Sequence, residues 1–203
     1  MNKKIGVVVL AAGLATRMGQ QKLLLPLRNQ PLITYILQTT ASLPFADKIA
    51  VIGEPCQELT KICTHYGMTS IYNADRNKGQ SSSIKLGLSQ LSPDLDGLMF
   101  VPGDQPLLSV ALLQALTDCF CECYHPDRII VPYWRGEYRS PAIFGNNWRE
   151  ELEQLTGDGG GRSIIRRHPE VITAVEWTDE HVFWDADTWE DYQRLVQWIV
   201  DSE

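Results

Sequence analysis

Two positively charged side chains follow an apolar segment near the amino terminus, within a stretch of small residues. Segment 5–10 is short and rich in β-branched residues, which predicts a buried strand. After it come Gly13, Arg17, Gly19 and Lys22. Glycines let the backbone approach a ligand closely, a guanidinium grips phosphate oxygens through its planar fork, and an ammonium adds a mobile charge. Because open α/β sheets bind ligands at the carboxyl ends of their strands, this loop predicts a polyphosphate site with both cations exposed to the ligand.

The loop matches neither of two common phosphate-binding patterns, the G-x-x-x-x-G-K-[ST] P-loop and the G-x-G-x-x-G dinucleotide fingerprint. It reads L-A-A-G-x-x-x-R-M-G-x-x-K, which resembles the nucleotide-binding signature of MobA-like nucleotidyltransferases, most closely their molybdenum-cofactor cytidylyltransferase branch. A glycine-rich turn with surface cations is the alternative. The resemblance implies that Arg17 and Lys22 are catalytic. It also implies nucleotide contacts from Leu10, Ala11, Ala12, Gly13, Arg17, Gly19 and Lys22.

A serine cluster follows the expected strand 69–72. Segment 73–84 places three serines at the start of a helix, where hydroxyls cap free amides and the helix dipole favours an anion. Capping alone would explain them. The spacing N-x(5)-G-x-S-S-S also resembles an element that lies beside the base and ribose in the same family. That resemblance implies nucleotide contacts from Gly79, Ser82 and Ser83.

One carboxylate lies just past another apolar strand. Asp104 follows segment 98–101 and is held between Gly103 and Pro106. Mg²⁺ prefers oxygen ligands and usually takes one or two carboxylates plus substrate phosphates. The same residue types also form plain turns. Their match to the family's G-D-x-P implies that Asp104 is catalytic, contacts the nucleotide and binds Mg²⁺, with Mn²⁺ as an alternative.

A second acidic element precedes the expected carboxyl-terminal helix. Its sequence, Asp185-Ala186-Asp187-Thr188, resembles the family's D-x-D-T-P-x-D, with Trp189 in place of the proline. Asp187 and Thr188 could simply cap the helix. The resemblance implies instead that Asp187 is the second metal ligand, with Asp185 as the alternative. Asp187 is then expected to share one divalent ion with Asp104.

Two other segments leave questions open. Arg139-Ser140-Pro141 stands where the related cytidylyltransferases carry Gly-His-Pro, so the resemblance does not fix the acceptor substrate. The glycine-rich loop 157–162 bears an arginine and could close over an anionic group, act as a hinge or merely connect two elements. A helical turn is expected after it, through Ile165.

The five cysteines predict reduced thiols, because an odd number in a chain of this size argues against a disulfide framework. Cys119, Cys121 and Cys123 lie near His125 and could form a zinc site. In the expected helix from Ala111, however, positions 119 and 123 share one face and 121 points elsewhere. Three ligands could not converge there without unwinding of the helix.

Length and composition limit the remaining possibilities. A chain of 203 residues fits a single nucleotidyltransferase domain, 1–203. The net charge of −7 argues against nucleic acid or an anionic membrane as the main partner. No stretch approaches the ~18 apolar residues of a membrane span. The amino-terminal apolar run is too short for a signal peptide and leads straight into the proposed site. We therefore expect a cytoplasmic protein, and a monomer.

Strands alternate with helices along the chain. This order predicts an α/β fold with a mostly parallel sheet, helices on both faces and one antiparallel strand near 138–144. The resemblance specifies a single-domain, Rossmann-like, three-layer α/β/α sandwich of the nucleotide-diphospho-sugar transferase type.

The resemblance implies a Mg²⁺-dependent CTP:molybdopterin cytidylyltransferase, which transfers CMP to a molybdopterin-type phosphate acceptor and releases pyrophosphate. The Ala11-Ala12 pair favours CTP, since the guanylyl branch usually reads Leu-Ala-Gly-Gly. Alternatives are a related transferase acting with GTP or on a sugar phosphate, and a non-catalytic insertion protein for molybdenum hydroxylases, to which a product could also be handed over. The absent G-x-G-x-x-G argues against a nicotinamide-dependent oxidoreductase.

Overall fold

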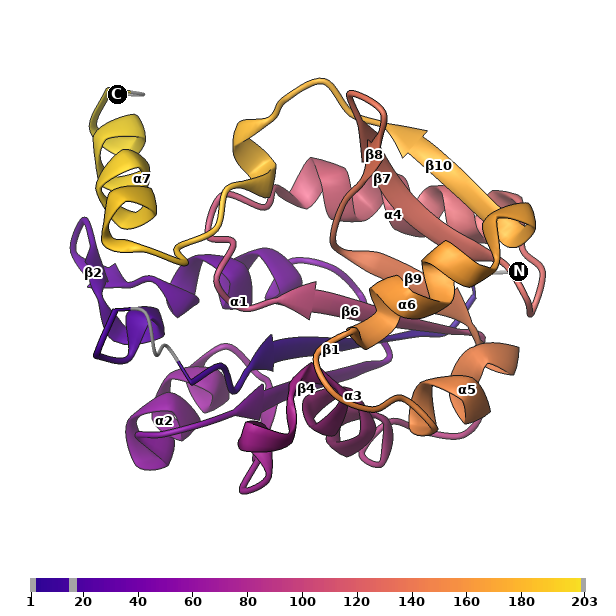
Figure 1. The fold of residues 1–203 in the computed structure, drawn as a ribbon, viewed down its shortest axis with the longest axis horizontal. Helices are drawn as coiled ribbons and strands as arrows, with labels where there is room; N and C mark the ends of the chain where they lie inside the picture. Colours follow the sequence, from indigo (N-terminus) through magenta and orange to yellow (C-terminus); the bar gives the residue numbers. More distant parts are fainter. Residues whose placement is uncertain (1–2, 15–17, 202–203) are drawn as a thin grey trace.

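The computed structural model describes residues 3–14 and 18–201, and it places the first apolar segment at the centre of a sheet (Figure 1). This strand, β1 (Ile5–Ala11), pairs in parallel with β4 (Asp47–Ile52) on one side and with β6 (Gly97–Pro102) on the other. Because the three strands run in the same direction, the loops that follow them meet at one edge of the sheet.

The sheet extends on both sides of these three strands in the order β10-β7-β9-β6-β1-β4-β5. One edge is β5 (Thr69–Tyr72), which is parallel to β4. Beyond β6, β9 (Ala142–Gly145) runs antiparallel between β6 and β7 (Ile129–Trp134), and β10 (Ile172–Glu176) forms the other edge parallel to β7. The expected late antiparallel strand is β9. The short β8 (Glu137–Tyr138), antiparallel to β7, is a second one.

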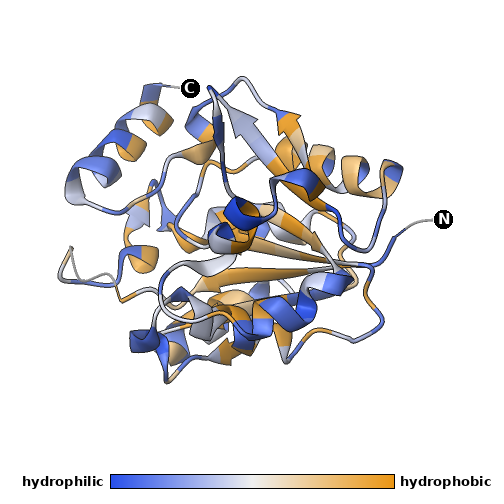
Figure 2. Cartoon of the chain, turned by 45° about the vertical axis from the view of Figure 1, so that its right-hand side comes forward, coloured by the Kyte–Doolittle hydropathy of each residue, from blue (hydrophilic) through white to orange (hydrophobic). Residues whose placement is uncertain are grey.

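Helices cover both faces of the sheet, and three layers result. One face carries α1 (Ile33–Ala41), α2 (Cys56–His65), α4 (Val110–Glu122) and α7 (Trp189–Asp201), and the other carries α3 (Gln80–Leu88), α5 (Arg149–Glu153) and α6 (Gly160–Arg167). Val7 and Val9 of β1 pack with the first group, whereas Val8 packs with the second, because successive side chains of a strand point to opposite faces. Figure 2 shows the hydrophobic strands enclosed between helices with hydrophilic outer surfaces. No helix within the described ranges is both long and apolar enough to span a bilayer.

The sequence patterns do not predict a small second sheet, in which β2 (Pro26–Leu27) pairs antiparallel with β3 (Gln30–Pro31). Strands of two residues carry too little alternation to be recognised. The helical turn expected through Ile165 is the longer helix α6. Short 3₁₀ segments complete the structure at Lys22–Leu24, Arg76–Lys78, Asn146–Trp148, Pro169–Val171 and His181–Phe183.

Candidate functional site

The loops after β1 and β6 are joined at the carboxyl edge of the sheet. The backbone N–H of Gly103 donates to the carbonyl of Leu10 over 2.9 Å. A side chain at position 103 would place its Cβ 2.8 Å from that same oxygen, so glycine is required for the close approach. This packing brings Asp104, the next residue, beside the loop that follows β1.

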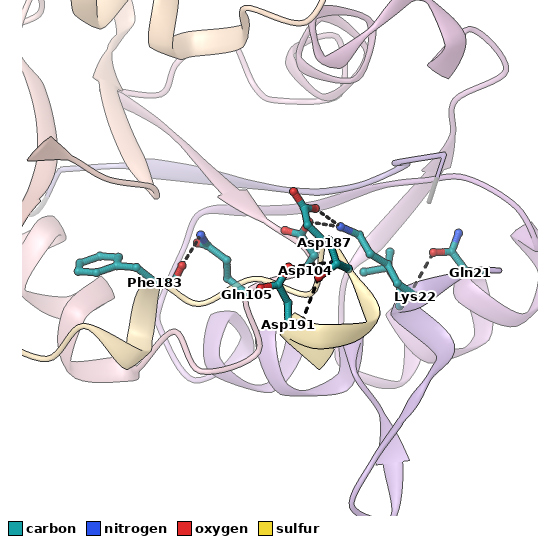
Figure 3. A network of polar contacts seen from close by, with 9 residues as sticks. Gln21, Lys22, Asp104, Gln105, Phe183, Asp187 and Asp191 are labelled. Atoms are coloured by element: carbon teal, nitrogen blue, oxygen red, sulfur yellow. Dashed lines mark hydrogen bonds and ion pairs between the residues drawn. The ribbon is translucent and has the colours of Figure 1, made fainter. Parts of the chain in front are cut away.

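Lys22 links the two predicted metal ligands. Its Nζ donates to Asp104 Oδ2 over 2.6 Å and to Asp187 Oδ1 over 2.7 Å (Figure 3). Only 9% of Lys22 is exposed, so the expectation of an exposed cation is wrong for this residue, although it lines the cavity described below. The contact could not be read from the motif, because the three residues come from separate loops.

The start of α7 determines where Asp187 lies. Thr188 and Asp191 cap the helix reciprocally: the Asp191 N–H donates to Thr188 Oγ1 over 3.1 Å, and the Thr188 N–H donates to Asp191 Oδ2 over 3.0 Å. The Ala186 N–H donates to the carbonyl of Asp104 over 3.1 Å, which joins this segment to the loop after β6. Thr188 thus serves as the cap, and Asp187, just before it, contacts Lys22.

The three charged groups influence one another and Asp185. Burial disfavours the Lys22 ammonium, but Asp104 and then Asp187 outweigh it and hold the Lys22 pKa above its ordinary value. At Asp185, burial and the negative charges of Asp187 and Asp104 raise the pKa of the carboxyl to about 6. Asp187 and Asp104 therefore share the Lys22 ammonium. Asp185 lies in surroundings that disfavour its charge.

A cavity of about 420 Å³ opens over this edge of the sheet. Its wall unites the loop after β1, the segment before α3 and the two aspartates. Of the predicted site residues, the wall contains Leu10, Ala11, Ala12, Gly13, Lys22, Gly79, Ser83, Asp104 and Asp187. Residues that we did not assign from the sequence also line it, among them Gln21, Arg76, Gln80 and Asp158. Arg76 could have been found as a cation inside the serine-rich element.

Two described residues of the predicted nucleotide contacts do not line this cavity. Among the described residues of the two motifs, Gly19 and Ser82 are outside the cavity wall. Arg17 lies outside the described residues. Ser82 and Ser83 each accept a hydrogen bond of 2.9 Å from Nδ2 of the buried Asn73, so one side chain positions both hydroxyls.

The glycine-rich loop before α6 packs against the serine-rich segment. Gly79 has φ +91°, and a Cβ there would lie 2.5 Å from the backbone carbon of Gly157 and from Asp158 Oδ1. The Ser81 N–H also donates to the Gly157 carbonyl over 3.1 Å. This loop is therefore a packed connection. It carries Asp158 into the wall of the first cavity.

A second cavity of about 560 Å³ adjoins the first. The residues that line both cavities are Leu10, Gln80, Pro102, Asp104, Asp158 and Asp187. The other walls of the second cavity come from the segment between β8 and β9 and from α6. Arg139 and Ser140, where the sequence departs from the family's Gly-His-Pro, both line this cavity. The departure thus lies in the cavity that shares the two aspartates with the first one.

The two aspartates suit a divalent cation whose remaining ligands come from a substrate. Within residues 3–14 and 18–201, no group of three or more His, Cys, Asp or Glu side chains could hold a metal. Asp104 and Asp187 nevertheless each place an oxygen within 2.7 Å of one nitrogen atom. Two converging carboxylates are the protein ligands that Mg²⁺ or Mn²⁺ usually has when phosphates supply the rest.

Cys119, Cys121 and Cys123 are free thiols. Helix α4 extends to Glu122, so the geometry that separates position 121 from the other two is present. Among the described residues these cysteines belong to no group of side chains that could hold a metal, so the zinc alternative has no support.

Comparisons with known proteins agree with this arrangement. Residues 7–171 match the family model of the MobA-like NTP transferase domain. The chain is 30% identical over 197 residues to the purine catabolism protein PucB of Bacillus subtilis, covering 93% of this chain and 94% of PucB. It is 31% identical over 202 residues to a probable molybdenum cofactor guanylyltransferase of Pyrococcus furiosus, covering 95% of this chain and 97% of that protein.

The fold is also found in a crystal structure of Rv0371C from Mycobacterium tuberculosis H37Rv in complex with manganese. The TM-score is 0.78 at 27% identity, over 96% of this chain and 98% of that one. The sequence match thus covers most of the chain, including the β1 loop, the serine-rich segment and Asp104, which line the first cavity. The chain belongs to the MobA-like NTP transferase family.

Proposed function

We propose that this nucleotidyltransferase transfers CMP from CTP to a phosphate group of a molybdopterin-type acceptor and releases pyrophosphate. The observation that carries the proposal is the junction of two cavities at Asp104 and Asp187. The first cavity would hold the nucleotide and the second the acceptor, so that the reacting groups meet at the aspartates.

The transfer reaction requires the protein to position the reactants and to stabilise charge. An oxygen of the acceptor phosphate attacks the α-phosphorus of the nucleotide, the new P–O bond forms, and the bond to the β-phosphate oxygen breaks as pyrophosphate leaves. Lys22 and Arg76 supply positive charge on the nucleotide side. Arg17 is expected to do the same. Such a transfer needs no covalent protein nucleophile.

Asp104 and Asp187 would hold Mg²⁺, with Mn²⁺ as an alternative supported by the manganese complex of the mycobacterial relative. When bound, the ion neutralises negative charge on the reacting phosphates. Lys22 keeps the two carboxylates together in the ligand-free protein. Once it is released from one of them, its ammonium can donate to a phosphate oxygen.

The candidate nucleotides differ in their base. Ala11 and Ala12 line the first cavity, and the alanine pair supports CTP. GTP is the second candidate, because a relative that aligns with nearly the whole chain is named as a probable guanylyltransferase. A further alternative is a non-catalytic role in cofactor insertion, against which the set of Lys22, Asp104 and Asp187 argues.

One assay separates these candidates. The protein is incubated with each of the four nucleoside triphosphates, purified molybdopterin cofactor and either Mg²⁺ or Mn²⁺, and pyrophosphate is measured. We expect release with CTP that requires the acceptor and the metal. Equal or faster release with GTP would replace cytidylyl by guanylyl transfer, and no release with any triphosphate would leave the insertion role.

We further propose that residues 1–203 act as one nucleotidyltransferase domain, as a monomer in the cytoplasm, and that the product passes to a molybdenum hydroxylase. The match to the family model over residues 7–171 supports the first part. The others rest on the resemblance of the nucleotide-binding loop to the cytidylyltransferase branch.

A further inference from the structure

Three arginines line the second cavity. Arg139 comes from the segment between β8 and β9, and Arg162 and Arg166 come from α6. The cavity also carries carboxylates, which are Asp104, Glu137, Asp158, Asp185 and Asp187. An anionic ligand could enter such a space only where cations offset these negative charges.

The two arginines of α6 are four residues apart and therefore lie on one face of the helix. Neither has a carboxylate within salt-bridge distance in the described part of the chain. The neighbouring Arg167, on another face, forms an ion pair with Glu151, with 2.7 Å between Nη2 and Oε1. Acidic residues outnumber basic ones in this protein, 25 to 18, so the lack of partners does not come from a shortage of carboxylates.

Arg139 has one buried N–H donor without an acceptor. Its Nη2 pairs with Glu137 Oε2 over 2.8 Å, and its guanidinium lies 5.2 Å from the centre of the Trp134 ring. These contacts hold the group in place. Its Nε is buried and has no hydrogen-bond acceptor among the described residues. The side chain as a whole is 32% exposed and lines the second cavity, so its guanidinium can meet a ligand there.

We propose that Arg139, Arg162 and Arg166 bind a phosphate group of the acceptor substrate in the second cavity. The inference rests on the proposed function and adds to it the residues that would bind the phosphate of the acceptor. Guanidinium groups suit this task because they grip phosphate oxygens with two parallel N–H groups. The arginines act in binding and specificity, while the transfer itself takes place at the aspartates that the two cavities share.

Calorimetric titration with inorganic phosphate tests the anion site directly. The variants are Arg139→Gln, Arg162→Gln and Arg166→Gln, and the matched control is Arg167→Gln, which removes the same charge from the same helix. Each is measured without nucleotide and with saturating CTP and Mg²⁺, which fills the first cavity. We expect about tenfold weaker phosphate binding in each of the first three variants and a change below about twofold in the control, as the loss of a charged hydrogen bond predicts.

The proposal is overturned if the wild-type protein does not bind phosphate, if Arg162→Gln and Arg166→Gln bind it as well as wild type, or if Arg167→Gln weakens it equally. Thermal melting shows whether Arg139→Gln is folded, and the two α6 variants carry the test if it is not.

Steady-state kinetics then separate this proposal from the proposed function. The arginine variants should raise KM for the molybdopterin acceptor and leave KM for CTP unchanged. If KM for CTP rises instead, the arginines are not acceptor ligands. If CTP is no substrate at all while phosphate binding still depends on the arginines, the proposed nucleotide fails and the anion site remains.

Discussion

The ammonium of Lys22 lies 2.6 Å from Asp104 Oδ2 and 2.7 Å from Asp187 Oδ1. The structure thus places an internal cation between the two carboxylates that we propose hold a divalent ion. Without that ammonium, two carboxylates in one site would repel each other. We therefore expect a metal ion to compete with Lys22 for these carboxylates.

We expect Lys22→Met to bind Mn²⁺ in the absence of nucleotide at least about tenfold more tightly than wild type, because the competing charge is gone. Use of CTP should fall, since a charged hydrogen bond to phosphate worth about 1.5–3 kcal/mol is lost. Calorimetry with Mn²⁺ and pyrophosphate release measure the two effects. Lys78→Met is the control, because that lysine is exposed and forms an ion pair with Asp75. Unaltered Mn²⁺ affinity in Lys22→Met would show that the lysine does not compete with the ion.

Asp104→Asn and Asp187→Asn should each abolish turnover, because an amide of the same shape gives no charge to the ion. The double variant should be little worse than either single one, as for residues that act as a unit. Pyrophosphate release gives the rates, and Mn²⁺ affinity is measured in parallel. Asp185→Asn is the comparison, because Asp185 lies close by but is not bound to Lys22. If Asp185→Asn is inactive while Asp187→Asn is active, Asp185 is the second metal ligand.

Asn73→Ala should disturb the nucleotide cavity from within. The buried Asn73 amide donates to Ser82 and Ser83 and accepts from the Asp75 N–H over 2.9 Å. Its loss leaves buried polar groups unpaired, which costs about 1–3 kcal/mol of unfolding free energy. Urea unfolding measures that loss, and a raised KM for CTP would report the released serines. Asn77→Ala, at an exposed position in the same segment, should change neither quantity. Equal effects of the two substitutions would argue against a positioning role for Asn73.

Cys63 should make stability fall at alkaline pH. Burial raises the pKa of its thiol from 9.0 to about 11. The folded state thus keeps a proton that the unfolded chain loses, so the contribution is complete below about pH 9 and is lost as pH rises toward 11. The loss amounts to about 2–3 kcal/mol of unfolding free energy.

Urea unfolding at pH 8 and at pH 10.5 measures this slope. Cys63→Ala should be less stable than wild type at pH 8 but should lose less on going to pH 10.5. Cys121→Ala, which removes a half-buried thiol from α4, is the control and should keep the wild-type slope. Identical slopes in all three proteins would exclude Cys63 as the source.

The sequence by itself determined the order of the main strands and helices and the position of the glycine-containing loop after β1. A continuous β-branched segment with Val7, Val8 and Val9 can only be a strand covered on both faces, and glycine spacing is a local property of the chain. Strong local patterns of this kind also gave α1, α4 and the strand that precedes Asp104. They do not extend to pairs such as β2 and β3, whose two residues have no period.

Only the tertiary structure decided which charges meet. Lys22, Asp104 and Asp187 follow different elements, and their contact depends on strand order and on the Thr188–Asp191 cap. The helical spacing of Arg162 and Arg166 is visible in the sequence, but the cavity that they share with Arg139 is not. Local patterns fix the period and face of each element, whereas the neighbours of a side chain across a sheet edge depend on how the whole chain packs.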